Sequence, residues 1–348
     1  MVRSLKHIIL VFVITLLACS KEESSTQNRF MYRNDKADMM VYIEGNIASK
    51  TFILLLHGGP GGDGSAYNFG TYAKLLEEQY AIVYWDQRGQ GASQGKYKDD
   101  NTTISQMADD TYELSKLIKQ MYGDESSVFL LGHSWGGMLG TAALVETEIQ
   151  TEIKGWIDAD GAHNIPFLNQ EAIKMFREVS RVALNQDPSN EFWNNVQTFV
   201  DTVDTNNISI QAGGLINEYG HQAEQTIADI TYDSAAPELS YYEYIFANPT
   251  SPYISFISGR MTSILLYDEV ESKSYSHRLD EITIPCLFQW GLYDFVVPPA
   301  LGYEAFNKVS TPTADKELII YNSSGHSPMS NEPIKFANDV ISFVERYK

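Results

Sequence analysis

The fold of this chain is decided by the stretch Gly132-His133-Ser134-Trp135-Gly136. Residues 126–131 before it form a short apolar run typical of a buried strand, and residues 138–145 after it have the composition of a helix. The pattern predicts a nucleophile elbow, a sharp strand-to-helix turn that exposes a serine hydroxyl. Glycine is needed on both sides because a Cβ would clash where strand and helix cross. The N-terminus of the helix would also favour a developing negative charge beside the serine.

Strands and helices alternate on both sides of this turn. Apolar runs predict further strands at residues 39–44, 51–56, 80–85, 153–160, 285–290 and 317–321, and helical spacing is found at residues 67–79, 104–122 and 333–348. Continuously apolar strands are typical of a sheet that helices cover on both faces. We therefore expect an α/β fold whose central sheet is mostly parallel and collects functional residues at the carboxyl ends of its strands.

The alternation breaks in the second half of the chain. Residues 163–275 are helical in character, rich in aromatic and acidic residues, and contain several prolines. A length of 348 residues suits one core domain that carries a smaller insertion. We interpret residues 30–162 and 276–348 as the core and residues 163–275 as an inserted helical cap.

The first residues have the features of an export signal. Arg3 and Lys6 precede an apolar run that is too short to span a membrane comfortably, and this run ends in Leu16-Leu17-Ala18-Cys19. The ending resembles the lipobox of bacterial lipoproteins. The resemblance implies that residues 1–18 are removed, that Cys19 carries a lipid anchor and that residues 19–29 form a tether. The protein would then be exported and anchored in the bacterial cell envelope, in the outer membrane; an ordinary secretory signal is the alternative.

The charge of the chain argues against a nucleic-acid partner, and its cysteine content argues against a disulfide. The chain has 25 lysine and arginine residues against 45 aspartate and glutamate residues, a formal net charge of −20. Such a surface repels phosphate backbones, so we expect no nucleic-acid partner. Cys286 lies in an apolar run and is interpreted as a small buried hydrophobe, and with Cys19 assigned to the anchor no disulfide is expected. The sequence leaves the oligomeric state open.

A serine hydroxyl becomes a nucleophile when a base removes its proton and an acid orients that base. Among the seven histidines, His326 is the candidate base, because it follows the last predicted strand in a loop that can return over the sheet. Asp294 is the first candidate acid, because it follows the strand at residues 285–290 and keeps the chain order serine, aspartate, histidine. Asp160 and Asp158, near the end of the preceding strand, are the alternatives.

Attack on a carbonyl carbon creates an oxyanion that N–H groups must stabilise. The backbone N–H of Trp135 should supply one donor, and the glycine-rich turn at residues 57–62 should supply the other, with Gly59 chosen first by analogy and Gly58 second. The sequence contains no His-x-x-x-His pair, Cys/His cluster or Gly-x-x-x-x-Gly-Lys loop. We therefore expect neither a metal nor another cofactor.

Three motifs together resemble the prolyl aminopeptidase (proline iminopeptidase) branch of the α/β-hydrolase superfamily. They are His57-Gly58-Gly59-Pro60-Gly61-Gly62, Asp86-Gln87-Arg88-Gly89-Gln90-Gly91 and Gly132-His133-Ser134-Trp135-Gly136-Gly137. The resemblance implies a serine hydrolase that removes N-terminal residues, often proline, from short peptides without a metal. Members of the branch often have glycine before the elbow serine and serine or threonine after the elbow, where this chain has His133 and Gly137.

The resemblance also implies that acidic residues of the cap hold the free α-amino group of the substrate. Glu218 and Glu243 are the first candidates, because both lie among tyrosines that could wall a pocket; Glu224 and Glu238 are further candidates. Two other functions stay open: a carboxylesterase or lactonase that uses the same triad on small acyl substrates, and a lipoprotein that binds without catalysis. An aminopeptidase should reject N-acylated substrates, whereas an esterase should accept them.

Overall fold

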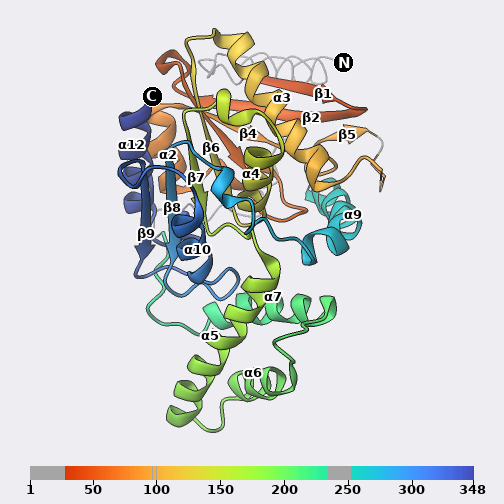
Figure 1. The fold of residues 1–348 in the computed structure, drawn as a ribbon, viewed down its shortest axis with the longest axis vertical. Helices are drawn as coiled ribbons and strands as arrows, with labels where there is room; N and C mark the ends of the chain where they lie inside the picture. The colour runs from red at the N-terminus through yellow and green to blue at the C-terminus, as the bar shows by residue number, and fades with distance from the viewer. Residues whose placement is uncertain (1–27, 96, 99, 234–251) are drawn as a thin grey trace, which may run out of the picture.

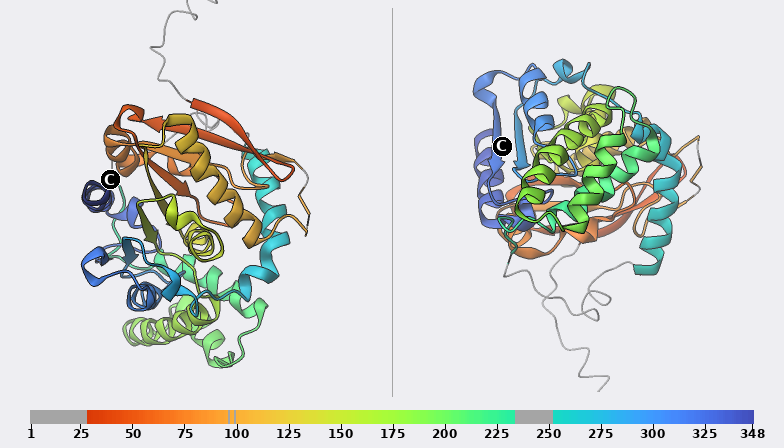
Figure 2. Two further views of the ribbon diagram at one scale, coloured as in Figure 1. Left: turned by 45° about the horizontal axis from the view of Figure 1, so that its top comes forward. Right: turned by 90° about the horizontal axis from the view of Figure 1, so that it is seen from below.

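One mixed sheet forms the centre of the structure, and helices lie on both of its faces (Figures 1 and 2). The computed structural model describes residues 28–95, 97, 98, 100–233 and 252–348. The predictions for residues 1–18, Cys19, Glu238 and Glu243 lie outside these residues. Among the helices that are described, none combines the length and the apolar character that crossing a bilayer requires.

The described sheet has nine strands and is mostly parallel. The strands are β1 (Asn28–Asn34), β2 (Ala37–Gly45), β3 (Thr51–Leu56), β4 (Ala81–Trp85), β5 (Gln94–Gly95), β6 (Ser127–His133), β7 (Gly155–Ala159), β8 (Cys286–Gly291) and β9 (Lys316–Tyr321). Their order along the sheet is β1-β2-β4-β3-β6-β7-β8-β9, and β5 pairs with β2. Neighbours from β4 to β9 along this order are parallel, whereas β2 pairs antiparallel with β1, β4 and β5. The predicted α/β fold with a mostly parallel sheet is confirmed.

Two layers of helices cover the sheet. On one face pack α3 (Ile104–Tyr122), α4 (Trp135–Glu146) and α10 (Ala300–Lys308), and on the other α2 (Gly70–Gln79) and α12 (Pro333–Tyr347). Strand β3 shows why such a strand is apolar throughout. Phe52, Leu54 and Leu56 belong to the core under the first layer, while Ile53 and Leu55 belong to the core under the second.

Four described helices lie between β7 and β8 in the chain. Of these, α5 (Ile165–Gln186), α6 (Glu191–Thr202) and α7 (Ile210–Glu224) project from one end of the sheet, and α9 (Pro252–Glu271) contacts α3 (Figure 1). The first three enclose a small core of their own, which takes in Phe295 from the loop after β8. This contact joins the projecting helices to the strand end at which Asp294 lies.

Several element boundaries differ from the expectation drawn from the sequence, and two of them lie at the start of the core and of α2. β1 begins at Asn28, two residues before the predicted start of the core at residue 30, and its side chains alternate, with Tyr32 buried and Met31 exposed. α2 begins at Gly70 rather than at residue 67, because a 3-10 turn comes first and Gly70 has a φ of +88°. The other short elements are α11 (Pro328–Asn331) and 3-10 turns at Ile47–Ser49, Gly64–Tyr67, Ile149–Thr151, Leu279–Glu281 and Thr313–Asp315.

Candidate active site

The predicted elbow is present between β6 and α4. Ser134 has a φ of 59° and a ψ of −119°, so its backbone is held in the left-handed half of conformational space. A Cβ on Gly136 would lie 1.9 Å from the carbonyl oxygen of Leu56, and one on Gly132 would lie 2.4 Å from that of Gly136. Both contacts are impossible for a side chain, which explains the two glycines. Trp135 is the first residue of α4, where a backbone N–H has no intrahelical acceptor.

The glycine-rich turn after β3 lies against the serine. A Cβ on Gly58 would lie 3.4 Å from the Cβ of Ser134, and Gly59 has a φ of +138°, which side chains rarely tolerate. Gly59, Ser134 and Trp135 line the same cavity of about 170 Å³. The structure thus brings the candidate nucleophile and both candidate oxyanion donors to one space.

His326 and Asp294 form a buried pair beside this elbow. Nδ1 of His326 donates to Oδ2 of Asp294 over 2.9 Å, and Oδ1 of Asp294 accepts from the N–H groups of Val296 and Val297 at 2.8 and 2.7 Å. Burial lowers the pKa of His326 to about 3, so its imidazole is neutral at neutral pH, as a general base must be. Burial raises the pKa of Asp294, and the two backbone N–H groups oppose that effect.

The two alternative acids occupy other places. Asp160 is fully buried, its Oδ1 accepts from the N–H of Gly291 at 2.9 Å, and its carboxyl group lies against that of Asp294. Burial, and then the charge of Asp294, raise the pKa of Asp160. Asp158 packs behind the elbow, where a Cβ on Gly161 would lie 2.0 Å from its Oδ1. Burial raises the pKa of Asp158 to about 8.

His133 ties the base to the elbow. Its Nε2 donates to the carbonyl oxygen of His326 at 2.6 Å, and because burial lowers its pKa to about 3, the neutral ring accepts at Nδ1 from the hydroxyl of Tyr67 at 2.7 Å. Nitrogens of His133 and His326 and an oxygen of Asp160 lie within 4.8 Å of one another, a spacing that would suit a metal ion. Both nitrogens of His133 are already hydrogen-bonded, so we interpret the group as part of the hydrogen-bond network around the base.

The described part of the cap contributes a carboxyl group to the cavity beside Ser134. Glu271, the last residue of α9, lines this cavity together with Asn169 from α5 and Asn217 from α7. Glu271 is half-buried, and burial raises its pKa to about 7. The sequence analysis did not single it out, since Asp268 and Glu269 stand beside it in the chain and no local pattern separates the three.

Glu218 and Glu224, the two other candidate acids that the structure describes, lie outside the cavity beside Ser134. Glu218 is exposed on α7, accepts from Nε2 of Gln222 at 3.2 Å and is not among the residues that line this cavity. Glu224, the last residue of α7, accepts at Oε1 from the N–H of His326 at 3.1 Å and from that of Phe295 at 3.3 Å. It therefore holds both loops that carry the His326–Asp294 pair, and burial raises its pKa to about 7.

Comparison with known proteins identifies the family of this chain. The chain belongs to the family described as alpha/beta hydrolase fold, which its residues 51–333 match. The protein is therefore a hydrolase, and the fold class expected from its sequence is the fold of this family.

Named relatives resemble the chain over most of its length. A Bacillus subtilis protein named probable aminopeptidase YbaC is 24% identical over 313 residues, which cover 86% of this chain and 90% of the relative. A proline iminopeptidase of Saccharolobus solfataricus is 24% identical over 298 residues, 84% of each chain. Among solved structures, an esterase from Exiguobacterium antarcticum has a TM-score of 0.56 at 20% identity, over 91% of this chain and 98% of the esterase.

Proposed function

We propose that this hydrolase is a serine aminopeptidase of the proline iminopeptidase type, which releases N-terminal residues from short peptides. The observation that carries the proposal is Glu271, a half-buried carboxyl group in the same cavity as Ser134. A carboxylate in that position can pair with the ammonium group of a free N-terminus, and partial burial strengthens the pairing. The names of two relatives, an aminopeptidase and a proline iminopeptidase, support the same class.

In the proposed mechanism Ser134, Asp294 and His326 act as a triad. His326 takes the proton of the Ser134 hydroxyl as the oxygen attacks the carbonyl carbon of the scissile bond, while Asp294 keeps Nδ1 of the ring protonated and oriented. The oxyanion would accept from the N–H groups of Trp135 and Gly59. His326 then gives its proton to the leaving amine. Water next takes the place of the amine: His326 removes a proton from it as its oxygen attacks the acyl carbon, and the acyl group leaves Ser134, which recovers its proton from His326.

The size and lining of the cavity fit one small N-terminal residue. About 170 Å³ is room for a side chain such as that of proline and not for several residues. The apolar part of the lining includes Met138, Ile165, Leu168, Val296 and Val297. An apolar floor with one carboxyl group would select a small apolar residue whose amino group is free.

The test compares substrates that differ only at the amino group. We expect L-proline p-nitroanilide to be cleaved and its N-acetyl derivative to be rejected. Glu271→Gln should lower kcat/KM for the free-amine substrate about 30-fold, which corresponds to about 2 kcal/mol for a partly buried charge pair. Asp268→Asn, an acid-to-amide change at an exposed position of the same helix, should leave it unchanged. Equal kcat/KM for the free and acetylated substrates would instead favour the carboxylesterase or lactonase.

We also propose that the enzyme is exported and anchored by a lipid on Cys19. The support is the sequence Leu16-Leu17-Ala18-Cys19 after a short apolar run. Cys19→Ser should move the protein from the membrane fraction to the soluble fraction without changing its specific activity. Membrane association that survives this substitution would contradict the anchor.

A further inference from the structure

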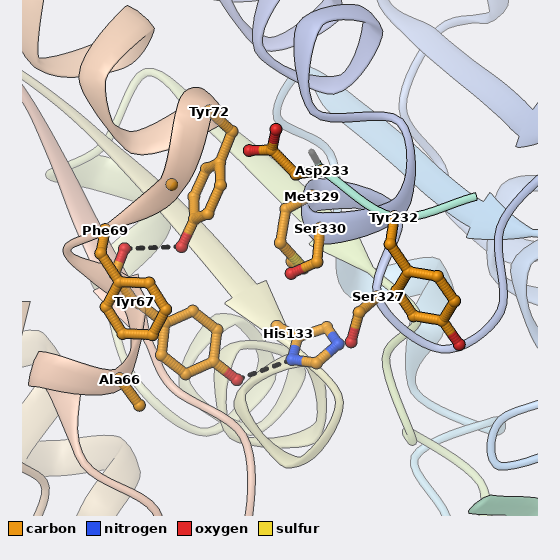
Figure 3. Close-up of a pocket in the computed structure, with 11 residues that line it drawn as sticks. Ala66, Tyr67, Phe69, Tyr72, His133, Tyr232, Asp233, Ser327, Met329 and Ser330 are labelled. Carbon is orange, nitrogen blue, oxygen red and sulfur yellow. Dashed lines mark hydrogen bonds between the residues drawn. The ribbon is translucent and has the colours of Figure 1, made fainter. Parts of the chain in front are cut away.

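A second cavity, of about 340 Å³, opens beside the elbow but does not include the catalytic candidates (Figure 3). Ser134, Gly59 and Trp135 are absent from its described lining, which shares no residue with the lining of the cavity that holds Glu271. Aromatic rings make up much of its wall: Tyr67, Phe69, Tyr72 and Tyr232. Its volume lies within the range of small-molecule sites in proteins.

The charge of this cavity is set by Asp233. The described residues that line it include no lysine or arginine, and its histidine, His133, is neutral because burial lowers its pKa to about 3. Oδ2 of Asp233 accepts from the N–H of Thr71 at 2.9 Å in the first turn of α2, and its own N–H donates to the carbonyl oxygen of Ser330 at 2.9 Å. These bonds fix the carboxylate in the wall.

The carboxylate and the rings are close neighbours. A Cβ placed on Gly70 would lie 3.7 Å from Oδ2 of Asp233 and 3.8 Å from Cδ1 of Tyr72, so both groups flank the same glycine. At the rim, the side chain of Tyr232 is 68% exposed. A carboxylate in the same cavity wall as tyrosine and phenylalanine rings can bind an organic cation, by charge pairing and by cation–π contact.

We propose that this cavity binds a small protonated amine with an apolar body, at a site separate from the cavity beside Ser134. The ammonium group pairs with the carboxylate of Asp233, and the apolar body packs among Tyr67, Phe69 and Tyr232. An anion of the same shape is repelled by Asp233, and a neutral alcohol loses the charge pairing. A ligand here also lies against Tyr67 and His133, the residues that connect the turn at Gly58 with the carbonyl of His326.

The probe for this site is 2-phenylethylamine, and isothermal titration measures its binding to the full chain. 2-Phenylethanol and 3-phenylpropionate serve as the neutral and anionic comparators of similar size. We expect the amine to bind at least about tenfold more tightly than either comparator, which corresponds to about 1.4 kcal/mol. Asp233→Asn should remove this preference, because the amide can still accept from Thr71 but carries no charge. Tyr232→Ala, at an exposed rim position, should weaken binding of the amine.

Two control variants locate the amine. Glu271→Gln removes the carboxyl group of the other cavity, and Tyr303→Ala removes a tyrosine that is 51% exposed on α10. Binding that survives both controls and is lost in Asp233→Asn supports the second site. Binding that is lost in Glu271→Gln and kept in Asp233→Asn places the amine beside Ser134 and overturns the second site, while agreeing with the proposed aminopeptidase. Equal binding of the three probes, or no binding of the amine, also overturns it.

Discussion

The carboxyl groups of Asp160 and Asp294 lie against each other, both fully buried, and each raises or lowers the pKa of the other. Two ionised carboxylates repel each other strongly when they are buried side by side, which favours a proton on one of the pair. Asp294 faces the imidazole and accepts from two backbone N–H groups, which favour its ionised form. Asp160 is therefore the member that we expect to keep the proton.

This division of roles predicts different results for two acid-to-amide changes. Asp294→Asn should lower kcat by about 10⁴-fold, because an amide cannot hold His326 in the required tautomer. Asp160→Asn should lower kcat by less than about tenfold, because an amide, like a protonated carboxyl group, carries no charge and can donate a hydrogen bond. Steady-state kinetics of both variants, with circular dichroism to verify folding, makes the comparison. The reverse ranking would move the catalytic acid to Asp160.

Ser134→Ala should lower turnover by about 10⁴- to 10⁶-fold, the range seen when a member of a serine triad is removed. The change deletes one oxygen from a partly exposed turn and leaves Gly132 and Gly136 in place, so the thermal unfolding temperature should stay close to that of the wild type. The measurement is kcat on L-proline p-nitroanilide, or on whichever substrate proves active. A folded variant with near-normal turnover would reject Ser134 as the nucleophile.

The pH dependence of free-amine hydrolysis should report Glu271. Because its pKa is raised to about 7, Glu271 is neutral below that pH and ionised above it. As pH falls through about 7, kcat/KM should therefore decrease for a substrate with a free amino group. The pKa of His326, about 3, is too low to cause this decrease.

A neutral ester substrate separates Glu271 from Glu224, whose pKa is also raised to about 7. Any decrease caused by Glu224 acts through the loops of the triad and should affect both kinds of substrate. The decrease in kcat/KM that occurs only with the free-amine substrate should disappear in Glu271→Gln. A pH profile that is the same in the wild type and in this variant would show that Glu271 does not bind the amino group.

Asp158 should make the protein less stable as pH rises. Its pKa is raised to about 8 in the folded protein by burial, whereas an unfolded aspartate titrates near 4. Below about pH 4 Asp158 is neutral in both the folded and the unfolded chain, so it does not change the free energy of unfolding. As pH rises from about 4 towards 8 the free energy of unfolding decreases, because Asp158 ionises only in the unfolded chain. Asp158→Asn removes the titrating group, so its free energy of unfolding should fall less over that interval.

Urea unfolding at several pH values measures this difference. The wild type and Asp158→Asn should diverge in free energy of unfolding by an amount that grows between about pH 5 and pH 8. Asp280→Asn changes an exposed aspartate and is the matched control, which should follow the wild type. Parallel curves for the wild type and Asp158→Asn would mean that Asp158 is already ionised in the folded state.

Some parts of the site could be predicted because the residues next to them in the chain restrict the backbone or mark the end of a strand. The elbow at Ser134 could be read directly because only glycine fits beside it, as the contacts of Gly132 and Gly136 show. His326 and Asp294 were found by their places after the last two predicted strands, since parallel strands present their carboxyl ends at one edge. The turn that contains Gly59 also follows a strand at this edge, but Gly59 itself was chosen by analogy with related hydrolases.

The acids of the cap could not be predicted in this way. Whether Glu218 or Glu271 reaches the cavity depends on how α7 and α9 pack, and both sequences contain acids that face solvent. Neither acid lies in a turn with special backbone needs, so no local rule marks it. β1 was missed for a different reason: its alternation of Tyr32 and Met31 is short and borders a polar segment.

Glu224 limits how this enzyme can be re-engineered. Caps are the natural part to exchange between related hydrolases when a new substrate range is wanted. Here the last residue of α7 supplies the acceptor for the N–H groups of Phe295 and His326, and a Cβ on Gly325 would lie only 2.4 Å from its Oε2. A chimera that imports another cap therefore has to bring a carboxylate at the same point and keep glycine at position 325. Without both, the loop that carries His326 would lose the acceptor that holds it in position, because that acceptor belongs to the exchanged cap.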